Sequence, residues 1–301
     1  MFTEKCITFL SCPIDGHDMK LSDKTIYCTS GHSFDISREG YINMLTSKKR
    51  FHENVGDNKE MLLSREHFLE KGYFDFLSEE INRIIIKHLR KGYEDEKEKQ
   101  HASSCVLEVG SGTAFYLKNL KTEIEKELLR NDFCYFGTDV SKEATKLSAK
   151  KYKDISFLVA DTDFNIPFKN EVAKILLNIF SPRNSREFVR LLKNNGLLIV
   201  VIPNNNHLNE LIDELGLIGI EKDKKEHLLT MFNELFKKVD ERDCEQKLLM
   251  DSDSVVDIVK MGPSYKYVDN RMIQKIRNMG SIKITASFNI SLYTKIEDFN
   301  S

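Results

Sequence analysis

The 301-residue sequence predicts an α/β protein with a mostly parallel sheet, preceded by a small module rich in cysteine and histidine. Short apolar segments alternate with amphipathic helical patterns through the middle of the chain, as in a parallel sheet covered on both faces. Glycines follow the first of these strands, where it turns into a helix. We expect a metal-binding module over 1–45, a linker with helices over 46–100 and the sheet domain over 101–301.

The first 45 residues are rich in turns and predict two short strands, near 19–21 and 25–28. A polar stretch over 46–60 follows, and from Met61 to about Arg90 the apolar residues recur with helical spacing. This segment therefore predicts helices that lead from the small module into the sheet domain.

Five apolar runs then predict the strands of the sheet, at 105–112, 133–140, 155–161, 172–180 and 196–203. Amphipathic helices are expected between several of them, including 141–152 and 185–193. The tail predicts further helices at 206–216, 224–238 and 253–261, and strands at 245–250 and 282–293. Strands that alternate with helices in this order indicate crossover connections.

Composition and charge restrict the class of protein only weakly. Hydrophobic residues make up 41% of the chain and charged residues 31%, yet the net charge is only −2. Binding to nucleic acid would therefore depend on local basic patches. The cysteines form no disulfide framework by their spacing, and no signal peptide or long apolar run is evident. We expect a cytoplasmic protein in a reducing compartment that spans no membrane.

The N-terminal module offers residues that could hold a metal ion. Cys12, Cys28 and His32 supply three of the four ligands that tetrahedral zinc takes from proteins. Asp15 stands where a second cysteine would complete a C-x-x-C pair, and it is the predicted fourth ligand. His17 and Cys6 are alternatives, and a module without metal remains open.

A glycine loop and two acids predict a nucleoside-binding site in the sheet domain. Gly110 and Gly112 follow the first strand, with Glu108 near its end, and they let the backbone turn sharply beside a ligand. Asp139 ends the second strand, where a carboxylate can accept both ribose hydroxyls. Asp161 ends the third strand, where it could meet an adenine edge. A plain tight turn, and a helix cap or solvated acid at Asp161, are the alternatives.

This series resembles the class I S-adenosylmethionine-dependent methyltransferases. The matching segments are EVGSG (108–112), the acid Asp139, DTDFNIPF (161–168) and a final β-hairpin. The resemblance implies a Rossmann-like, mostly parallel seven-stranded sheet. It implies S-adenosylmethionine as cofactor, bound by Glu108, Gly110, Gly112, Asp139 and Asp161. The third glycine of the family loop is Ala114 in this chain.

A narrower resemblance covers essentially the whole chain, to the RlmA family of guanine-N1 methyltransferases that act on large-subunit ribosomal RNA. It lies in HSFDISREGYINML (32–45), GDNKEMLLSR (56–65), NIFSP (178–182), HLNEL (207–211) and FNISLY (288–293). It implies N1 methylation of a guanine in an rRNA hairpin and a zinc-binding module that engages RNA. Some family members are linked to macrolide resistance. Asp15 departs from the family's second cysteine.

The loop after the fourth strand is where such enzymes place substrate groups, so Asn178 and Pro182 are the predicted catalytic residues. For Asn178 the alternative is a hydrogen bond to backbone at the end of the strand. The rings of Phe180 and Phe115 could stack on an extruded base, although each is also a candidate core residue. Basic side chains near the module and beside this loop are the predicted RNA contacts: Arg38, Lys48, Lys49, Arg50 and Arg183.

Two other functions stay open at this stage. One is a methyltransferase for a small molecule. The N-terminal module argues against it, because a small substrate needs no accessory domain to extend the binding surface. The other is a noncatalytic protein that binds RNA or the ribosome. The sequence also leaves open the target nucleotide, the general base, macrolide resistance and homodimer formation.

Overall fold

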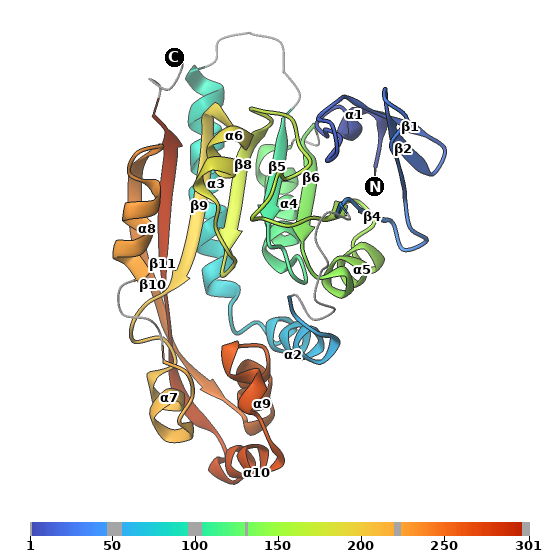
Figure 1. Ribbon diagram of the computed structural model, residues 1–301. Coiled ribbons are helices and arrows are strands. Elements are labelled where there is room, and N and C mark those ends of the chain that lie inside the picture. The colour runs from blue at the N-terminus through green and yellow to red at the C-terminus, as the bar shows by residue number, and fades with distance from the viewer. Residues whose placement is uncertain (1, 47–55, 96–103, 130–131, 220–223, 297–301) are drawn as a thin grey trace.

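The computed structural model describes residues 2–46, 56–95, 104–129, 132–219 and 224–296 (Figure 1). One large sheet runs through the molecule, and helices cover both of its faces. A small three-stranded antiparallel sheet lies beside it, built from the N-terminal segment. Among the described residues, no helix has the length and apolar composition needed to cross a membrane.

The large sheet has eight strands in the order β10-β11-β9-β8-β5-β6-β7-β4. The strands from β9 to β4 pair in parallel, whereas β11 pairs antiparallel with both β9 and β10. Their bounds are β4 (Tyr41–Asn43), β5 (Cys105–Val109), β6 (Cys134–Asp139), β7 (Ser156–Val159), β8 (Ala173–Ile179), β9 (Leu192–Pro203), β10 (Phe236–Met250) and β11 (Ile282–Lys295).

The predicted fold class is confirmed by this order. Seven strands form the Rossmann-like sheet of a class I methyltransferase, with the final hairpin of β10 and β11 inserting its second strand next to β9. The eighth strand, β4, is additional. No sequence pattern predicts it, because a strand of three residues is too short for a detectable apolar period. It lies just before the expected domain boundary at residue 45.

Two apolar clusters lie on the two faces of the sheet, and neighbouring residues of β5 alternate between them. Val106 belongs to the first cluster, while Leu107 and Val109 belong to the second. The first cluster is covered by α3 (Asp75–Asp95), α4 (Phe115–Leu128) and α5 (Lys142–Lys151). The second is covered by α6 (Ser185–Leu191), α8 (Lys224–Phe232) and the N-terminal module.

The N-terminal module packs directly on the sheet. It contains α1 (Glu4–Ile7), β1 (Met19–Ser22), β2 (Thr25–Cys28) and β3 (Ser33–Asp35). The ring of Phe9 meets that of Phe136 on β6 at 6.2 Å, and Leu10 bridges to Phe168. A disulfide joins Cys6 to Cys134, a difference from the sequence analysis, which expected no disulfide. The module is therefore fixed to the sheet.

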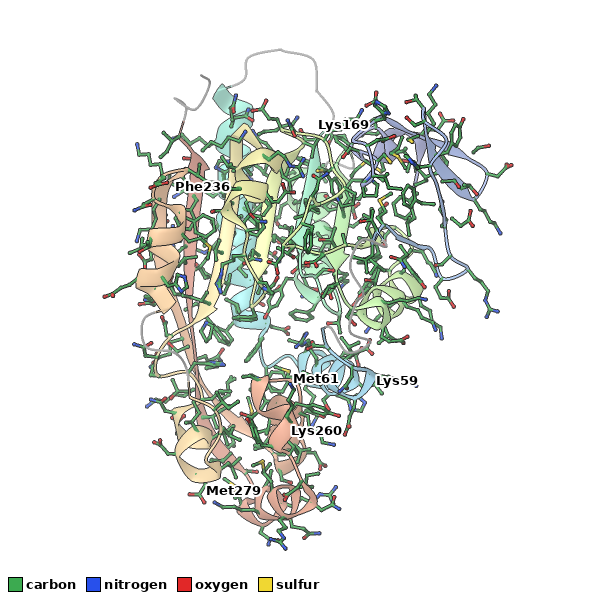
Figure 2. All side chains as sticks on the ribbon, viewed as in Figure 1. Lys59, Met61, Lys169, Phe236, Lys260 and Met279 are labelled. Atoms are coloured by element: carbon green, nitrogen blue, oxygen red, sulfur yellow. A yellow bond between two sulfur atoms is a disulfide. The ribbon has the colours of Figure 1, made fainter. Side chains whose placement is uncertain are left out.

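The C-terminal lobe lies beyond one end of the sheet, where β10 and β11 extend past the other strands (Figure 1). We use this name for α7 (Asn209–Leu215), α9 (Ser252–Lys260), the 3-10 helix η1 (Pro263–Tyr267) and α10 (Asn270–Met279). Helix α2 (Lys59–Glu70) packs against α9. Figure 2 shows Lys59 and Met61 on α2 above Lys260 at the end of α9.

Three segments differ from the prediction. The helical pattern of 61–90 is two helices, separated by a turn in which Gly72 has a φ of +80°. The helix expected over 224–238 ends at Phe232, and β10 begins at Phe236, earlier than the expected 245–250. Nine of the fifteen residues of this edge strand are exposed and six of those are charged, so the strand carries no apolar run that would predict it. Helix α10 was not predicted.

Candidate active site and metal centre

The glycine loop between β5 and α4 is held in one conformation. The N–H groups of Gly110 and Ser111 both donate to the carbonyl of Thr138 on β6, at 2.8 and 2.9 Å. Gly110 has a φ of +76°, and an ideal Cβ there would lie 1.9 Å from Oγ of Ser181. Only glycine fits this position, because it alone avoids both the strain and the overlap.

Asp139 faces this loop from the end of β6. Its Oδ2 accepts a hydrogen bond from the Gly112 N–H at 2.8 Å, and its Oδ1 accepts from the Ser141 N–H at 2.8 Å. Burial raises the pKa of Asp139, while these two hydrogen bonds lower it. The carboxylate is thus fixed against the loop, where the sequence analysis expected it. Its contact with a ribose stays a prediction.

Asp161 lies at the end of β7, as predicted from its place in the sequence. Its Oδ1 accepts a hydrogen bond from the Asp163 N–H at 2.9 Å, which stabilises the turn that follows. The side chain is only partly buried. Its contact with an adenine edge also stays a prediction.

Two residues of the GDNKEMLLSR segment lie at the loop, although the sequence analysis gave that segment no role. The hydroxyl of Ser141 donates to the carbonyl of Asp57 at 2.9 Å, which places Asp57 over the end of β6. Arg65 on α2 forms an ion pair with Asp57, and its Nη1 comes within 3.1 Å of an ideal Cβ on Gly112. The sequence signal for both residues was their place in the segment GDNKEMLLSR (56–65), which resembles the RlmA family.

A cavity of about 660 Å³ opens between the glycine loop, the loop after β8 and the C-terminal lobe. Glu108 lines it, and its buried Oε2 has no hydrogen-bond partner among the described residues. Burial raises the pKa of Glu108 to about 8. An unpartnered buried carboxyl and the cationic Arg65 in one cavity suit a ligand that carries both a positive and a negative charge.

The loop after β8 forms the opposite wall. Phe180 has a φ of +54°, which is strained for a non-glycine residue, and its ring is 43% exposed. The ring lies 5.1 Å from that of Phe288 on β11 and 6.3 Å from that of Tyr116. Pro182 lines the same cavity. This wall therefore presents apolar and aromatic surface, suited to a planar base.

Asn178 is fully buried beneath this loop and is absent from the cavity wall. Its Nδ2 donates to the carbonyl of Pro182 at 2.9 Å and to Oγ of Ser181 at 3.2 Å. This placement does not match the predicted direct contact of Asn178 with a substrate. Asn178 instead positions the loop, because its amide ties the loop to the end of β8.

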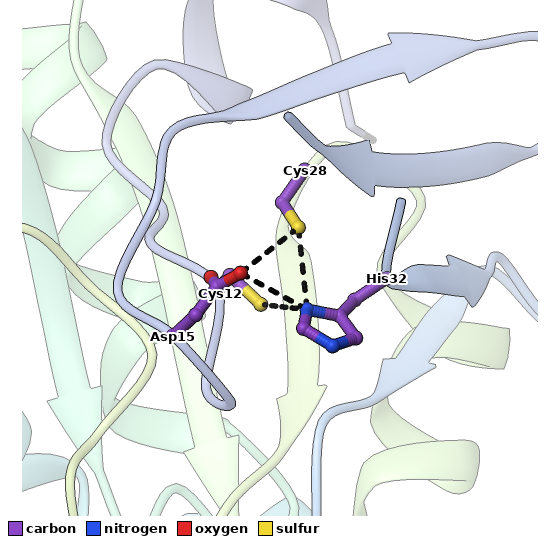
Figure 3. Close-up of side chains that lie close together, drawn as sticks. All are labelled: Cys12, Asp15, Cys28 and His32. Atoms are coloured by element: carbon purple, nitrogen blue, oxygen red, sulfur yellow. Dashed lines mark hydrogen bonds and ion pairs between the residues drawn. The ribbon is translucent and has the colours of Figure 1, made fainter. Parts of the chain in front are cut away.

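Four residues of the N-terminal module converge as the sequence predicted. One potential ligand atom from each of Cys12, Asp15, Cys28 and His32 lies within 4.8 Å of the other three (Figure 3). Nδ1 of His32 is 3.6 Å from Sγ of Cys12, 3.4 Å from Sγ of Cys28 and 3.1 Å from Oδ2 of Asp15. Ligands of a tetrahedral zinc ion lie roughly 3.3–3.8 Å apart, so the arrangement fits zinc.

The alternatives for the fourth ligand lie elsewhere. Cys6 is joined to Cys134. Nδ1 of His17 lies 2.8 Å from Oγ of Ser30 and 3.2 Å from Oδ2 of Asp15, so His17 contacts the cluster without being one of its four members. Burial raises the pKa of Cys12 to about 11, so a thiolate at this position needs a cation to stabilise its charge. The donor set therefore suits a bound metal ion.

Two of the predicted RNA contacts, Arg38 and Arg183, lie in the described part of the chain. Arg38 is exposed in the turn between β3 and β4. Arg183 lines the cavity, and burial lowers its pKa. Lys48, Lys49 and Arg50 lie outside the described residues.

The sheet order, the glycine loop with its facing acid, and the cysteine and histidine module define a class I methyltransferase fold that carries an N-terminal zinc ribbon. Residues 10–50 match the family profile described as RlmA, N-terminal, a zinc ribbon. The chain belongs to the RlmA family.

The chain is similar to two curated proteins and to one solved structure. The chain is 29% identical over 288 residues to 23S rRNA (guanine(748)-N(1))-methyltransferase of Streptomyces fradiae, covering 94% of this chain and 96% of that protein. It is 33% identical over 213 residues to YxjB of Bacillus subtilis, covering 66% of each chain. It is also similar to the solved structure of MccD, with 19% identity, a TM-score of 0.43 and coverage of 64% of this chain and 90% of MccD.

Proposed function

We propose that this protein transfers a methyl group from S-adenosylmethionine to N1 of a guanine in 23S ribosomal RNA. The observation that carries the proposal is a glycine loop, held by the Asp139 carboxylate, that lines a cavity whose other wall is aromatic. The full-length similarity to a 23S rRNA guanine-N1 methyltransferase supports the choice of substrate. A ribosomal substrate also agrees with the expected cytoplasmic location.

The residues present fit the cofactor. Asp139 and Asp161 lie outside the cavity wall, at the ends of the neighbouring strands; there Asp139 would accept the ribose hydroxyls and Asp161 would meet the adenine. The unpartnered carboxyl of Glu108 and the guanidinium of Arg65 would bind the ammonium and carboxylate groups at the other end. When bound, S-adenosylmethionine supplies an electrophilic methyl group on a positively charged sulfur.

The protein's own part in the reaction is alignment and the exclusion of water. Asn178 holds the loop that carries Phe180 and Pro182, so the aromatic wall keeps a fixed distance from the glycine loop. A guanine seated against Phe180 would place its Watson–Crick edge inside the cavity, and fixed alignment of nucleophile and methyl group lowers the barrier to transfer.

The ribosomal substrate is tested by transfer of a labelled methyl group from S-adenosylmethionine to isolated 23S rRNA, followed by digestion and nucleoside analysis. We expect the label in 1-methylguanosine, and we expect none in a metabolite extract offered in parallel. Label that enters a small molecule and leaves the RNA unmodified would refute the proposed substrate.

We also propose that Cys12, Asp15, Cys28 and His32 hold a structural zinc ion. The purified protein should carry a stoichiometric zinc ion by elemental analysis. Replacing Cys28 with serine should weaken zinc binding by at least the roughly 10- to 100-fold that loss of an outer partner costs. Cys244→Ser is the matched control, because Cys244 is a free cysteine on β10 that lies outside the cluster.

The fourth position allows a sharper test of the zinc site. Asp15→Cys should bind zinc more tightly than the natural protein, because a thiolate is a softer ligand than a carboxylate. Equal zinc affinity in Cys28→Ser and in the natural protein would show that the cluster holds no zinc.

A further inference from the structure

His207 lies in the loop between β9 and α7, and this loop is fastened to β11. The Asn204 N–H donates to the Ser287 carbonyl at 3.0 Å, and the Leu208 N–H donates to the Thr285 carbonyl at 2.8 Å. The imidazole ring packs against that of Phe288, with 4.6 Å between the ring centres. These contacts hold the ring in one place before any substrate arrives.

The hydrogen bonding of His207 fixes its tautomer. The Ser287 N–H donates to Nδ1 of the ring at 3.2 Å. A backbone amide can only donate, so Nδ1 carries a lone pair and the single proton of the neutral ring is on Nε2. Burial lowers the pKa of His207 to about 4, and the nearby Glu210 raises it only in part. The Glu210 carboxylate is itself bound by the Thr285 N–H at 2.9 Å.

The Nε2–H group is available to a ligand. His207 lines the cavity together with Phe180, Pro182 and Phe288. The ring is half-buried, and no acceptor for Nε2 is found among the described residues. A fixed neutral donor therefore lies on the wall where the proposed base would sit.

We infer that Nε2–H of His207 donates a hydrogen bond to O6 of the target guanine, an inference that rests on the proposed function. In the reaction the N1 proton leaves to solvent, the N1 lone pair forms the new bond to the methyl carbon, and the carbon–sulfur bond breaks with its electron pair on sulfur. Loss of the N1 proton spreads negative charge onto O6. A preorganised donor at O6 stabilises that charge.

The same hydrogen bond selects guanine. At the position of guanine O6, adenine carries an amino group, which is itself a donor. A buried donor that faces another donor leaves both without an acceptor, and enzymes reject such substrates strongly. His207 thereby acts both as a catalytic residue and as a specificity-determining residue.

The test uses His207→Asn, in which the amide oxygen can still accept the Ser287 N–H while the Nε2 donor is lost. We expect kcat for RNA methylation to fall by about 100-fold or more, as when one oxyanion donor is removed. The rise of the rate with pH should move to higher pH, because N1 is then harder to deprotonate. Affinity for S-adenosylmethionine should stay within about twofold. His227→Asn, on the exposed side of α8, is the matched control and should leave all three unchanged.

A second measurement needs only the natural protein. A short RNA that carries 2-aminopurine at the methylated position lacks O6, and it should compete at least about tenfold more weakly than the guanine RNA. Equal competition by the two RNAs would overturn the proposed hydrogen bond to O6, and so would an unchanged kcat and pH profile in His207→Asn. Either result would leave the proposed function intact. Failure of the natural protein to methylate any RNA would overturn the proposed function, and this inference with it.

Discussion

Gly110→Ala is expected to abolish cofactor binding. The new Cβ would lie 1.9 Å from Oγ and 2.4 Å from Cβ of Ser181, so the loop after β8 would have to move. The residue would also keep a φ of +76°, and such strain costs about 1–3 kcal/mol for a residue other than glycine. We expect calorimetry to show a loss of S-adenosylmethionine affinity of about 100-fold or more, from strain and overlap together.

Two further variants separate the effect of steric overlap with Ser181 from the effect of backbone strain at a positive φ. Gly216→Ala introduces a similar left-handed residue, with a φ of +66°, at a position where nothing lies within 4 Å of the new Cβ. It should lower thermal stability slightly and leave cofactor affinity unchanged. Adding Ser181→Gly to Gly110→Ala removes the overlapping atoms and should recover part of the affinity. Wild-type affinity in Gly110→Ala alone would show that the glycine loop does not shape the cofactor site.

Asp139→Asn should weaken cofactor binding by about 1–3 kcal/mol, roughly 5- to 150-fold, the scale of lost hydrogen bonds to a charged group. The amide keeps the shape of the side chain, but it replaces one accepting oxygen with a donor that would face the Gly112 or Ser141 N–H. Asp163→Asn is the control, because Asp163 is exposed at the end of the neighbouring strand β7. An Asp139→Asn protein that binds S-adenosylmethionine normally would contradict the assigned role of this carboxylate.

Local sequence patterns were sufficient for most of the sheet domain. The strands β5, β6, β8 and β9 are buried on both faces, so each reads as a continuous apolar run. The relation of Asp139 to Gly112 followed from adjacent parallel strands that end at the same edge of the sheet. These predictions rest on short-range order and on one well-known topology.

Other features depend on contacts between distant parts of the chain. His207 lies 80 residues from Ser287, whose N–H sets its tautomer. The disulfide joins Cys6 and Cys134 across 128 residues. Both His207 and Arg65 stood inside segments that resembled the RlmA family, yet only the fold shows that they line one cavity. A pattern in sequence identifies such residues without saying what they face.

The placement of Asn178 shows a different limit. Its position at the end of a central strand marked it as functional, and the structure connects it to the loop after β8. Burial decides between a group that touches substrate and one that holds the loop, and the burial of Asn178 depends on the strands β5 and β9 that flank β8.

The most direct measurement of the whole account is mass mapping of methylated nucleotides in 23S rRNA from cells that produce this protein, from cells that lack it and from cells that produce Asp139→Asn. We predict one additional N1-methylated guanine with the natural protein, absent without it and strongly reduced with the variant. Identical methylation maps in all three would contradict the claim that this cavity binds S-adenosylmethionine in order to methylate ribosomal guanine.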